Sequence, residues 1–411
     1  GIAEGEWFPD IQGIGTYQRS RVSENGPDAP PSVSLPAPLP SISAPSVDET
    51  NLYALGFDAS WEIDVFGRVR RSVEAAQAEL EASVEDLRDT SVSLFAEVAL
   101  EYVRVRTLQD RLRIAHENVR RQGGTLTLTK DRFDADIAPD LDVAQAEANL
   151  YLTRSAIPTL ESLLRLSLNR IAFLIGRPPG ALPPEVLAPA PIPNAPEHVA
   201  IGLPANLVRQ RPDVRGAERR LAAQTARIGV ATADLYPRFS LTGSYAYVSL
   251  DSDDWLESDS REFSVGPSMG WSLFNGGRVR NNIKVQDERT EQLLEAYERA
   301  VLLALEETED ALVAFTQESL RRGELARAET SAERAVESVL VLYREGIADF
   351  QNVIDAEQRL FEVQDRLVAS RGAVVENLIS LYKALGGGWS AAARWPGEDA
   401  GREAFPPARH P

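Results

Sequence analysis

The chain contains an internal duplication, and this feature constrains its fold more than any other. The segment WEIDVFGRVR at 61–70 corresponds to WSLFNGGRVR at 271–280, at an offset of 210 residues. The same offset holds without a gap over more than a hundred residues. Upstream, an offset of 228 residues relates residues 9–17 to residues 237–245. A chain that repeats itself in this way is expected to fold as two copies of one structural plan.

Each copy predicts two strands followed by two long helices. The first structural repeat covers residues 1–177, and the second covers residues 205–388. The predicted strands lie at about 8–20, 52–66, 237–249 and 262–274. The predicted helices lie at about 68–135, 140–176, 212–235, 276–344 and 349–385. Residues 178–204 hold nine prolines and are expected to form a surface linker, and residues 389–411 a flexible tail.

The strands have one apolar side and one polar side. In residues 53–65, Tyr, Leu, Phe, Ala, Trp, Ile and Val occupy every second position. The positions between them include Asp58, Glu62 and Asp64. This alternation is the period of a strand with a dry face and a wet face. In the strand at 262–274, the residues between the apolar positions are small, mainly serine and glycine.

The helices are unusually long and have a heptad pattern. From Val73 to Ala115, one position of seven consecutive heptads is apolar except at Glu101. Heptads sustained over this length indicate coiled-coil packing. At 1.5 Å per residue, the helix predicted from Arg68 would be about 100 Å long. The helices of each copy are expected to pair as coiled coils.

Four strands are too few to close a barrel, because small closed barrels need about eight. An open sheet in lipid would leave unpaired backbone groups at both edges. The strands therefore predict an oligomer in which several chains complete one barrel. The apolar face would meet lipid, and the acidic face would line a water-filled lumen. We assign Asp58, Glu62 and Asp64 to this lumen; the alternative is the exposed face of a soluble antiparallel sheet.

Composition excludes several other classes of protein. The net charge of −19 and the pI of about 4.8 argue against nucleic-acid binding. The chain has no cysteine, and His116, His198 and His410 share no metal-ligand spacing, so we expect neither metal nor cofactor. No nucleophile elbow or phosphate loop is present, so we do not expect an enzyme. A soluble coiled-coil scaffold would explain the heptads, but it would not explain the four strands.

The motifs resemble those of the TolC family of outer-membrane efflux ducts, in particular the OprM/NodT-like branch. They are the segments at 203–244 and 343–361, together with SLFNGGRVR (272–280) and LYKALGGGW (381–389). The resemblance implies a homotrimer with a 12-stranded barrel, which acts with a periplasmic adaptor protein and an inner-membrane resistance–nodulation–division pump. It implies efflux of drugs or other small molecules from a Gram-negative bacterium. A protein-secretion duct of the same fold is the alternative, and the sequence does not identify the cargo.

Family members usually carry a lipidated cysteine at the mature N-terminus, which this sequence lacks. The first copy also lacks a counterpart of the helix at 212–235, so we interpret the sequence as truncated at its N-terminus. A lipid anchor on a cysteine upstream of Gly1 would then lie outside the sequence.

The resemblance also suggests the working parts of the duct. The helix–helix turns are expected to dock the adaptor; the alternative is that they are ordinary hairpin turns. Their residues are Asp136, Ile137, Ala138, Gly346, Ile347 and Ala348. Asp355 and Gln351 are expected to form the periplasmic gate, and the alternative for Asp355 is a solvated helix residue. Trp61 and Trp271, at matching places, are either membrane-interface anchors or packing residues near the strand ends.

Overall fold

The computed structural model describes residues 1–21, 49–196 and 209–387. The predicted tail at 389–411 and the second part of the predicted linker lie outside the described residues. The chain divides into two compact units, Gly1–Glu81 with Arg219–Glu295, and Ala82–Glu218 with Ala296–Pro411. Each unit combines segments of both sequence repeats.

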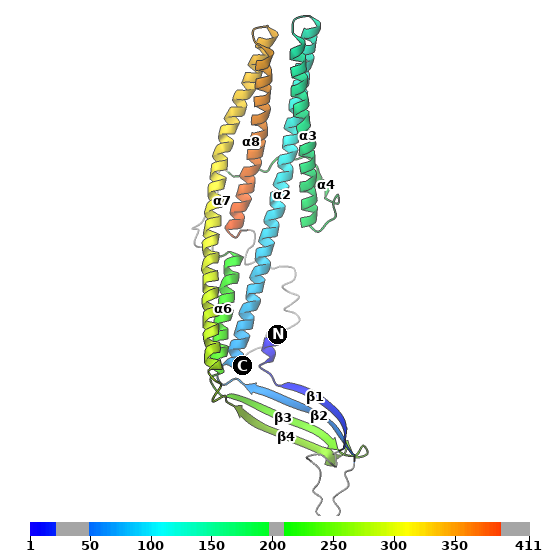
Figure 1. Ribbon diagram of the computed structural model, residues 1–411, viewed down its shortest axis with the longest axis vertical. Helices are drawn as coiled ribbons and strands as arrows, with labels where there is room; N and C mark the ends of the chain where they lie inside the picture. The colour runs from blue at the N-terminus through cyan, green and yellow to red at the C-terminus, as the bar shows by residue number, and fades with distance from the viewer. Residues whose placement is uncertain (22–48, 197–208, 388–411) are drawn as a thin grey trace, which may run out of the picture. The chain divides into compact units, whose positions relative to one another are not determined.

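One antiparallel sheet of four strands lies in the first unit. The strands are β1 (Asp10–Ser20), β2 (Thr50–Ile63), β3 (Arg238–Ser249) and β4 (Arg261–Gly270), in the order β1-β2-β3-β4 (Figure 1). A short helix, α1 (Ile2–Gly5), precedes β1, and the one-turn helix η1 (Ser258–Ser260) precedes β4. Within the described sheet, β1 and β4 each pair on one side only.

The register aligns the apolar positions of all four strands on one face. Phe57 lies opposite Tyr245, which lies opposite Phe263, and Trp61 lies opposite Leu241. Side chains alternate between faces along a strand, so these residues share a face. Phe263 is 75% exposed and Phe57 is 62% exposed. The larger members of this apolar face are Ile11, Tyr17, Leu55, Phe57, Trp61, Ile63, Phe239, Leu241, Tyr245, Tyr247, Phe263, Val265 and Met269.

The opposite face of the sheet carries mainly small and polar side chains. Asp58 lies between Gln12 of β1 and Ser244 of β3. The hydroxyls of Ser240 and Ser268 lie 2.9 Å apart on the same face. The predicted two-sided pattern is thus present in three dimensions. Ile14 is an exception, because it places an exposed apolar side chain among the polar ones.

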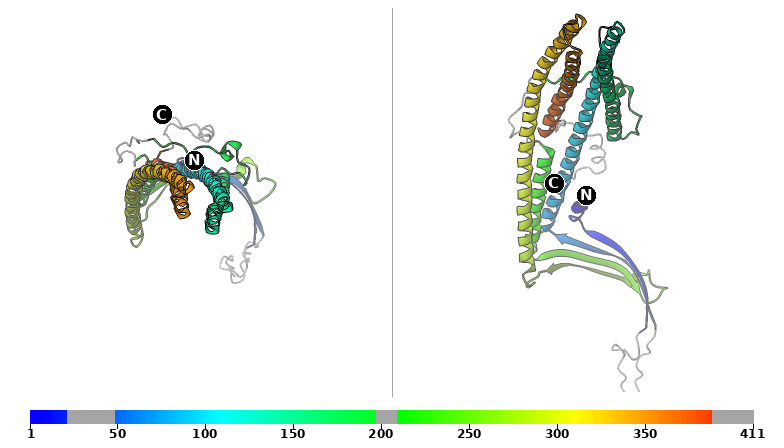
Figure 2. Two further views of the ribbon diagram at one scale, coloured as in Figure 1. Left: turned by 90° about the horizontal axis from the view of Figure 1, so that it is seen from above. Right: turned by 45° about the horizontal axis from the view of Figure 1, so that its top comes forward.

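The remaining elements are helices. They are α2 (Arg68–Asp134), α3 (Asp140–Leu174), α4 (Pro184–Leu187), α6 (Pro212–Ala233), α7 (Arg278–Arg344) and α8 (Phe350–Ala384). Figure 2 shows α3 lying along the later turns of α2, and α8 along the later turns of α7. Among the described helices, none combines the length and the apolarity needed to cross a membrane.

Three element boundaries differ from the sequence-based expectation. The strand expected at 52–66 ends at Ile63, because Asp64 turns the chain into α2 and caps that helix. The strand expected at 262–274 ends at Gly270. The linker, expected to lack regular structure, contains the short helix α4, where a proline occupies the first helical turn. The mainly helical fold with four strands is confirmed.

Apolar side chains hold the helices of each repeat together in the second unit. Leu108 and Ala115 of α2 pack against Leu160 of α3. Ala332 and Val336 of α7 pack against Leu360 of α8. These contacts are the heptad seams expected from the sequence.

Candidate functional site

The two helix–helix turns have the same backbone structure. Ile137 donates its backbone N–H to the Arg132 carbonyl (2.8 Å), and Ile347 donates to the Leu342 carbonyl (2.9 Å). The residues before them, Asp136 and Gly346, have φ values of 59° and 71°. Each turn is therefore a Schellman motif, which ends many helices. Glycine adopts such positive φ values without strain, whereas aspartate pays a conformational cost there.

The tips of the turns present apolar side chains to solvent. Ile137 is 63% exposed and Ile347 is 74% exposed. One Arg132 nitrogen donates to the Arg344 carbonyl (3.0 Å), and the Arg132 guanidinium lies 4.7 Å from the centre of the Tyr343 ring. The turn regions of the two repeats are therefore joined within one chain. Ala138 and Ala348 also lie in these turns, and the docking role of all six tip residues remains a prediction.

The two predicted gate residues are in direct contact. Gln351 donates from Nε2 to Oδ1 of Asp355 over 2.8 Å, one helical turn away. Gln145 of α3 makes a weaker bond to the Gln351 amide oxygen, at 3.4 Å. Asp355 and Gln351 are both exposed. The structure brings the pair together, and its role as a gate remains a prediction.

The three acidic residues predicted to line a lumen have different surroundings. Asp58 lies on the polar face of the sheet. Glu62 makes a two-pronged ion pair with Arg68, at 2.7 and 2.8 Å. Asp64 lies beyond β2, and its carboxylate accepts the backbone N–H groups of Val69 and Arg70. A carboxylate at the first turn of a helix stabilises that helix, so Asp64 has a structural role at the start of α2.

The matching tryptophans make matching hydrogen bonds. The Trp61 indole N–H donates to the Trp7 carbonyl (3.0 Å), and the Trp271 indole N–H donates to the Leu235 carbonyl (3.1 Å). Trp7 and Leu235 are themselves related by the offset of 228 residues. Each tryptophan therefore fixes the segment that precedes the first strand of its own hairpin. This contact accounts for the position of both residues without invoking a membrane interface.

The sequence reasoning did not find a polar seam between α2 of the first repeat and α8 of the second. Arg111 makes a two-pronged ion pair with Asp365, at 2.7 and 2.9 Å. Farther along α2, Asn118 donates to Gln364 (2.8 Å). A signal was available: the heptad position that is apolar at Leu108 and Ala115 continues as Gln122 and Thr129. Both of these polar side chains are buried.

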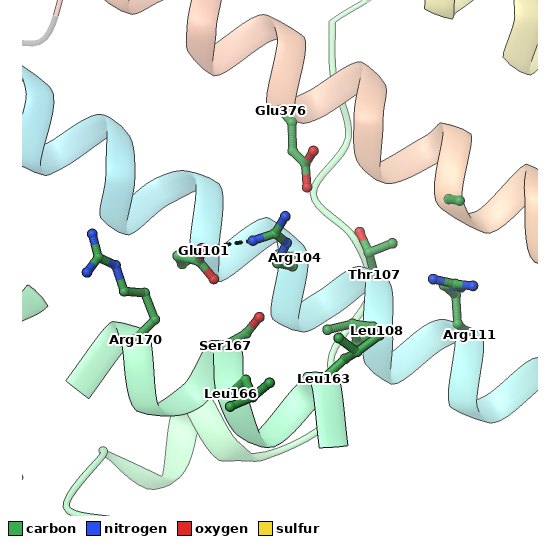
Figure 3. Close-up of a pocket in the computed structure, with 11 residues that line it drawn as sticks. Glu101, Arg104, Thr107, Leu108, Arg111, Leu163, Leu166, Ser167, Arg170 and Glu376 are labelled. Carbon is green, nitrogen blue, oxygen red and sulfur yellow. Dashed lines mark hydrogen bonds and ion pairs between the residues drawn. The ribbon is translucent and has the colours of Figure 1, made fainter. Parts of the chain in front are cut away.

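A cleft of about 560 Å³ lies beside this seam, between α2, α3 and α8 (Figure 3). Its arginines already have carboxylate partners: Arg104 pairs with Glu101 (3.1 Å) and Arg170 with Glu97 (3.0 Å). Burial raises the pKa of Glu376, which projects into the cleft from α8. The mutual pairing of these charges argues against a dedicated ligand site here.

No group of three or more His, Cys, Asp or Glu side chains in the described part of the chain is arranged to hold a metal ion.

Comparison with known proteins places the chain in a family. The family model for outer membrane efflux proteins matches residues 1–177 and 203–387. The pyoverdine export outer membrane protein OpmQ of Pseudomonas aeruginosa is 32% identical over 350 residues, which cover 84% of this chain and 72% of OpmQ. Nodulation protein T of Rhizobium leguminosarum bv. trifolii is 30% identical over 339 residues, covering 82% of this chain and 72% of that protein.

Solved structures agree with the sequence relatives. The outer-membrane channel OprN superposes with a TM-score of 0.85 at 33% identity, covering 94% of this chain and 83% of OprN. The open state of the MtrE outer membrane channel of Neisseria gonorrhoeae gives a TM-score of 0.80 at 26% identity, covering 94% of this chain and 82% of MtrE. The extent of these matches, over both repeats, shows that the chain belongs to the outer membrane efflux protein family.

Proposed function

We propose that this chain forms the outer-membrane exit duct of a tripartite efflux system and passes small molecules from the periplasm to the exterior. The observation that carries the proposal is the sheet with one continuous apolar face and two edges that have no partner strand within the described residues. An apolar face of this extent is stable in lipid, and lipid does not tolerate open strand edges. Three copies would supply 12 strands, close the barrel and remove all edges.

The polar face of the sheet would then line an aqueous pore. Its side chains are mainly Ser, Thr and Gly, so the pore would be open rather than filled. Asp58 would add negative charge to the lumen, whereas the charge of Glu62 is balanced by Arg68. Such a pore has no shaped pocket and would select little. OpmQ is named for pyoverdine export, and two Pseudomonas putida relatives that are 28% identical to this chain are named for solvent and toluene efflux pumps. We assign none of these substrates to this chain.

The helical turns are proposed to meet a periplasmic adaptor, which would connect the duct to an inner-membrane pump. The support is the pair of exposed isoleucines, Ile137 and Ile347, presented on two turns of identical backbone structure. Six such turns in a trimer would form a ring. Gln351 lies in the first turn of α8 and Asp355 in the second, and three copies of this pair are proposed to narrow the entrance. A ring of carboxylates would favour cations over anions.

The duplication also predicts which helices meet between subunits. Within one chain, α2 and α8 approach so closely that a Cβ on Gly372 would lie 3.1 Å from Cβ of Thr107. Applying the offset of 210 residues to both positions gives Ser162 of α3 and Gln317 of α7. These two helices carry exposed leucines, among them Leu152 and Leu166 on α3 and Leu302 and Leu320 on α7. We propose that α3 of one copy packs against α7 of the next.

A cross-linking experiment tests the assembly. The chain contains no cysteine, so the pair S162C and Q317C would provide the only thiols. Oxidation in outer membranes is expected to give covalent trimers, since the Cβ separation is near that of a disulfide. Each single variant is the control and should remain monomeric under denaturing conditions. Failure of the pair to cross-link, in a protein that still behaves as a trimer, would contradict the proposed helix pairing. A monomer in detergent would contradict the duct itself.

A conductance measurement tests the transport role. The purified protein in planar bilayers is expected to open cation-selective channels. Replacing Asp355 and Gln351 together by Ala should raise the conductance by widening the entrance. The replacement D58N should reduce cation selectivity and leave the entrance unchanged. Unaltered conductance and selectivity in the double variant would remove the gate assignment.

A further inference from the structure

A carboxylate is buried where three helices meet near the turns. Glu357 of α8 is 2% exposed. Its Oε1 accepts the hydroxyl of Thr125 on α2 at 2.6 Å, and its Oε2 accepts the amide of Asn149 on α3 at 3.1 Å. Both donors are neutral. A buried carboxylate without a cationic partner is costly to ionise.

The charged groups around Glu357 do not neutralise it. On α2, Arg121 is the charged side chain whose field acts on the carboxylate, but it is exposed and forms no ion pair with it in the described structure. On α3, the facing residue is the neutral Asn149. On α7, the carboxylate of Glu333 accepts a bond from Gln364, seven residues farther along α8 than Glu357. Burial is accordingly the largest influence on the Glu357 carboxyl, and it raises the pKa.

Unpaired polar atoms beside Glu357 indicate a place for water. Gln122 is 2% exposed, and neither atom of its amide has a hydrogen-bond partner. It lies on α2, one turn before Thr125. The amide oxygen of Asn149 is also buried without a partner. Buried polar atoms in native proteins are almost always paired, with protein or with ordered water. The buried amides of Gln122 on α2 and Asn149 on α3 thus have hydrogen-bonding atoms without a partner among the described residues.

The positions related to this site by the offset of 210 residues do not repeat the arrangement. The position equivalent to Glu357 is Glu147, which makes an exposed ion pair with Lys130 at 2.8 Å. The positions equivalent to Gln122, Thr125 and Thr129 are apolar: Ala332, Ala335 and Val339. Of the two related glutamates, Glu357 is buried in the seam between the repeats, whereas Glu147 is paired at the surface.

We propose that Glu357 is a proton-binding site that controls hydration of the seam between α2, α3 and α8. With the proton bound, the carboxyl is neutral and the seam stays closed around the few waters that pair with Gln122 and Asn149. When the proton leaves, the charge draws further water into the seam, and the helices separate there. Glu357 follows Asp355 by two residues on α8, so separation of the seam would move the proposed gate. This last consequence rests on the proposed duct function; the proton site itself does not.

Infrared difference spectroscopy of the full chain in detergent tests the proton site directly. In the wild type, the C=O band of a protonated carboxylic acid should persist at pH values above the ordinary pKa of glutamate. In E357Q, this band should be absent. The matched control E147Q should retain the band. The variant T125V removes a hydrogen bond to the charged form, so it should move the titration of the band to higher pH. A band that is unchanged in E357Q would overturn the proposal.

Conductance as a function of pH tests the link to the gate. The wild type is expected to conduct more as pH rises through the titration found by infrared, and T125V should shift that rise in the same direction. E357Q should lose the rise, and E147Q should keep it. Suppose that infrared confirms the proton site but the conductance of an active channel does not depend on pH. This result would overturn control of the gate and leave the proton site standing. Absence of any channel would instead contradict the proposed function.

Discussion

The two repeats share a backbone plan but differ in the chemistry of matching helix positions. Their turns make the same hydrogen bonds, and their tryptophans hold equivalent carbonyls. In contrast, α2 has Gln122 and Thr129 where α7 has Ala332 and Val339. Contacts that define the fold were thus retained in both copies, and the seams between helices diverged. The polar seam joins the two repeats within a chain.

The largest expected effect concerns the closest approach across this seam. A Cβ at Gly372 would lie 2.1 Å from the Thr107 hydroxyl oxygen, so G372A should force α2 and α8 apart. We expect a loss of about 1–3 kcal/mol in the free energy of unfolding, measured by denaturant titration. The equivalent replacement in the first repeat, S162A, is the control and should change stability little. The double variant G372A/T107A should recover part of the loss; no recovery would place the strain elsewhere.

The next effect is the pH dependence of stability contributed by Glu357. Its folded pKa is raised by burial, so the folded state holds a proton that the unfolded chain releases. The contribution of this proton to the free energy of unfolding is complete at pH values below the pKa of Glu357 in the unfolded chain. It is lost as pH rises through the pKa of Glu357 in the folded state. E357Q should therefore be more stable than the wild type at neutral pH, and the difference should shrink in acid. Thermal unfolding of both proteins across this range is the measurement. An E357Q that is less stable at neutral pH would contradict the prediction.

The matching tryptophans test the conserved part of the comparison. W61F and W271F each remove one indole N–H and keep an aromatic ring. We expect each to cost about 1 kcal/mol, the usual contribution of a hydrogen bond. Equal losses in denaturant unfolding would show that the two repeats use this contact in the same way. If only one variant loses stability, the indole hydrogen bond contributes to stability in that repeat alone.

The smallest effect concerns the two turns, which differ at one residue. Asp136 has the positive φ that Gly346 adopts freely, so D136G should stabilise the turn by about 0.5–1 kcal/mol. The reciprocal G346D should destabilise the other turn by a similar amount. Hydrogen exchange at the turn amides would report both changes locally. If D136G weakened protection, the aspartate side chain would have a stabilising role that outweighs its backbone cost.

The sequence predicted those features that depend on local periodicity. Alternation identified the four strands, and heptads with the duplication identified the long paired helices. The bond between Gln351 and Asp355 was within reach because the two residues are one helical turn apart. The polar positions Gln122 and Thr129 were visible in the sequence, but the partners across the seam were not within reach, because Arg111 and Asp365 are separated by 254 residues. A single sequence specifies the apolar stripe of a helix but not which distant helix a polar side chain will meet.

The role of Asp64 was missed for a different reason. It continues the alternation of β2 by one residue, so the pattern alone assigns it to the strand. Its carboxylate instead caps α2, a change of role that only the backbone turn reveals. Lumen lining by Asp58, gating by Asp355 and docking by the tip residues remain predictions.

The unpaired edges of β1 and β4 have a consequence for biogenesis. Before it pairs with other copies in the proposed trimer, a newly made copy would expose backbone N–H and C=O groups along both edges of the described sheet, next to the apolar face. Another extended polypeptide could pair with such an edge as an additional strand, and this pairing would lead to aggregation. If the chain works as the proposed trimer, its copies must therefore either be covered by a chaperone or associate faster than such contacts form.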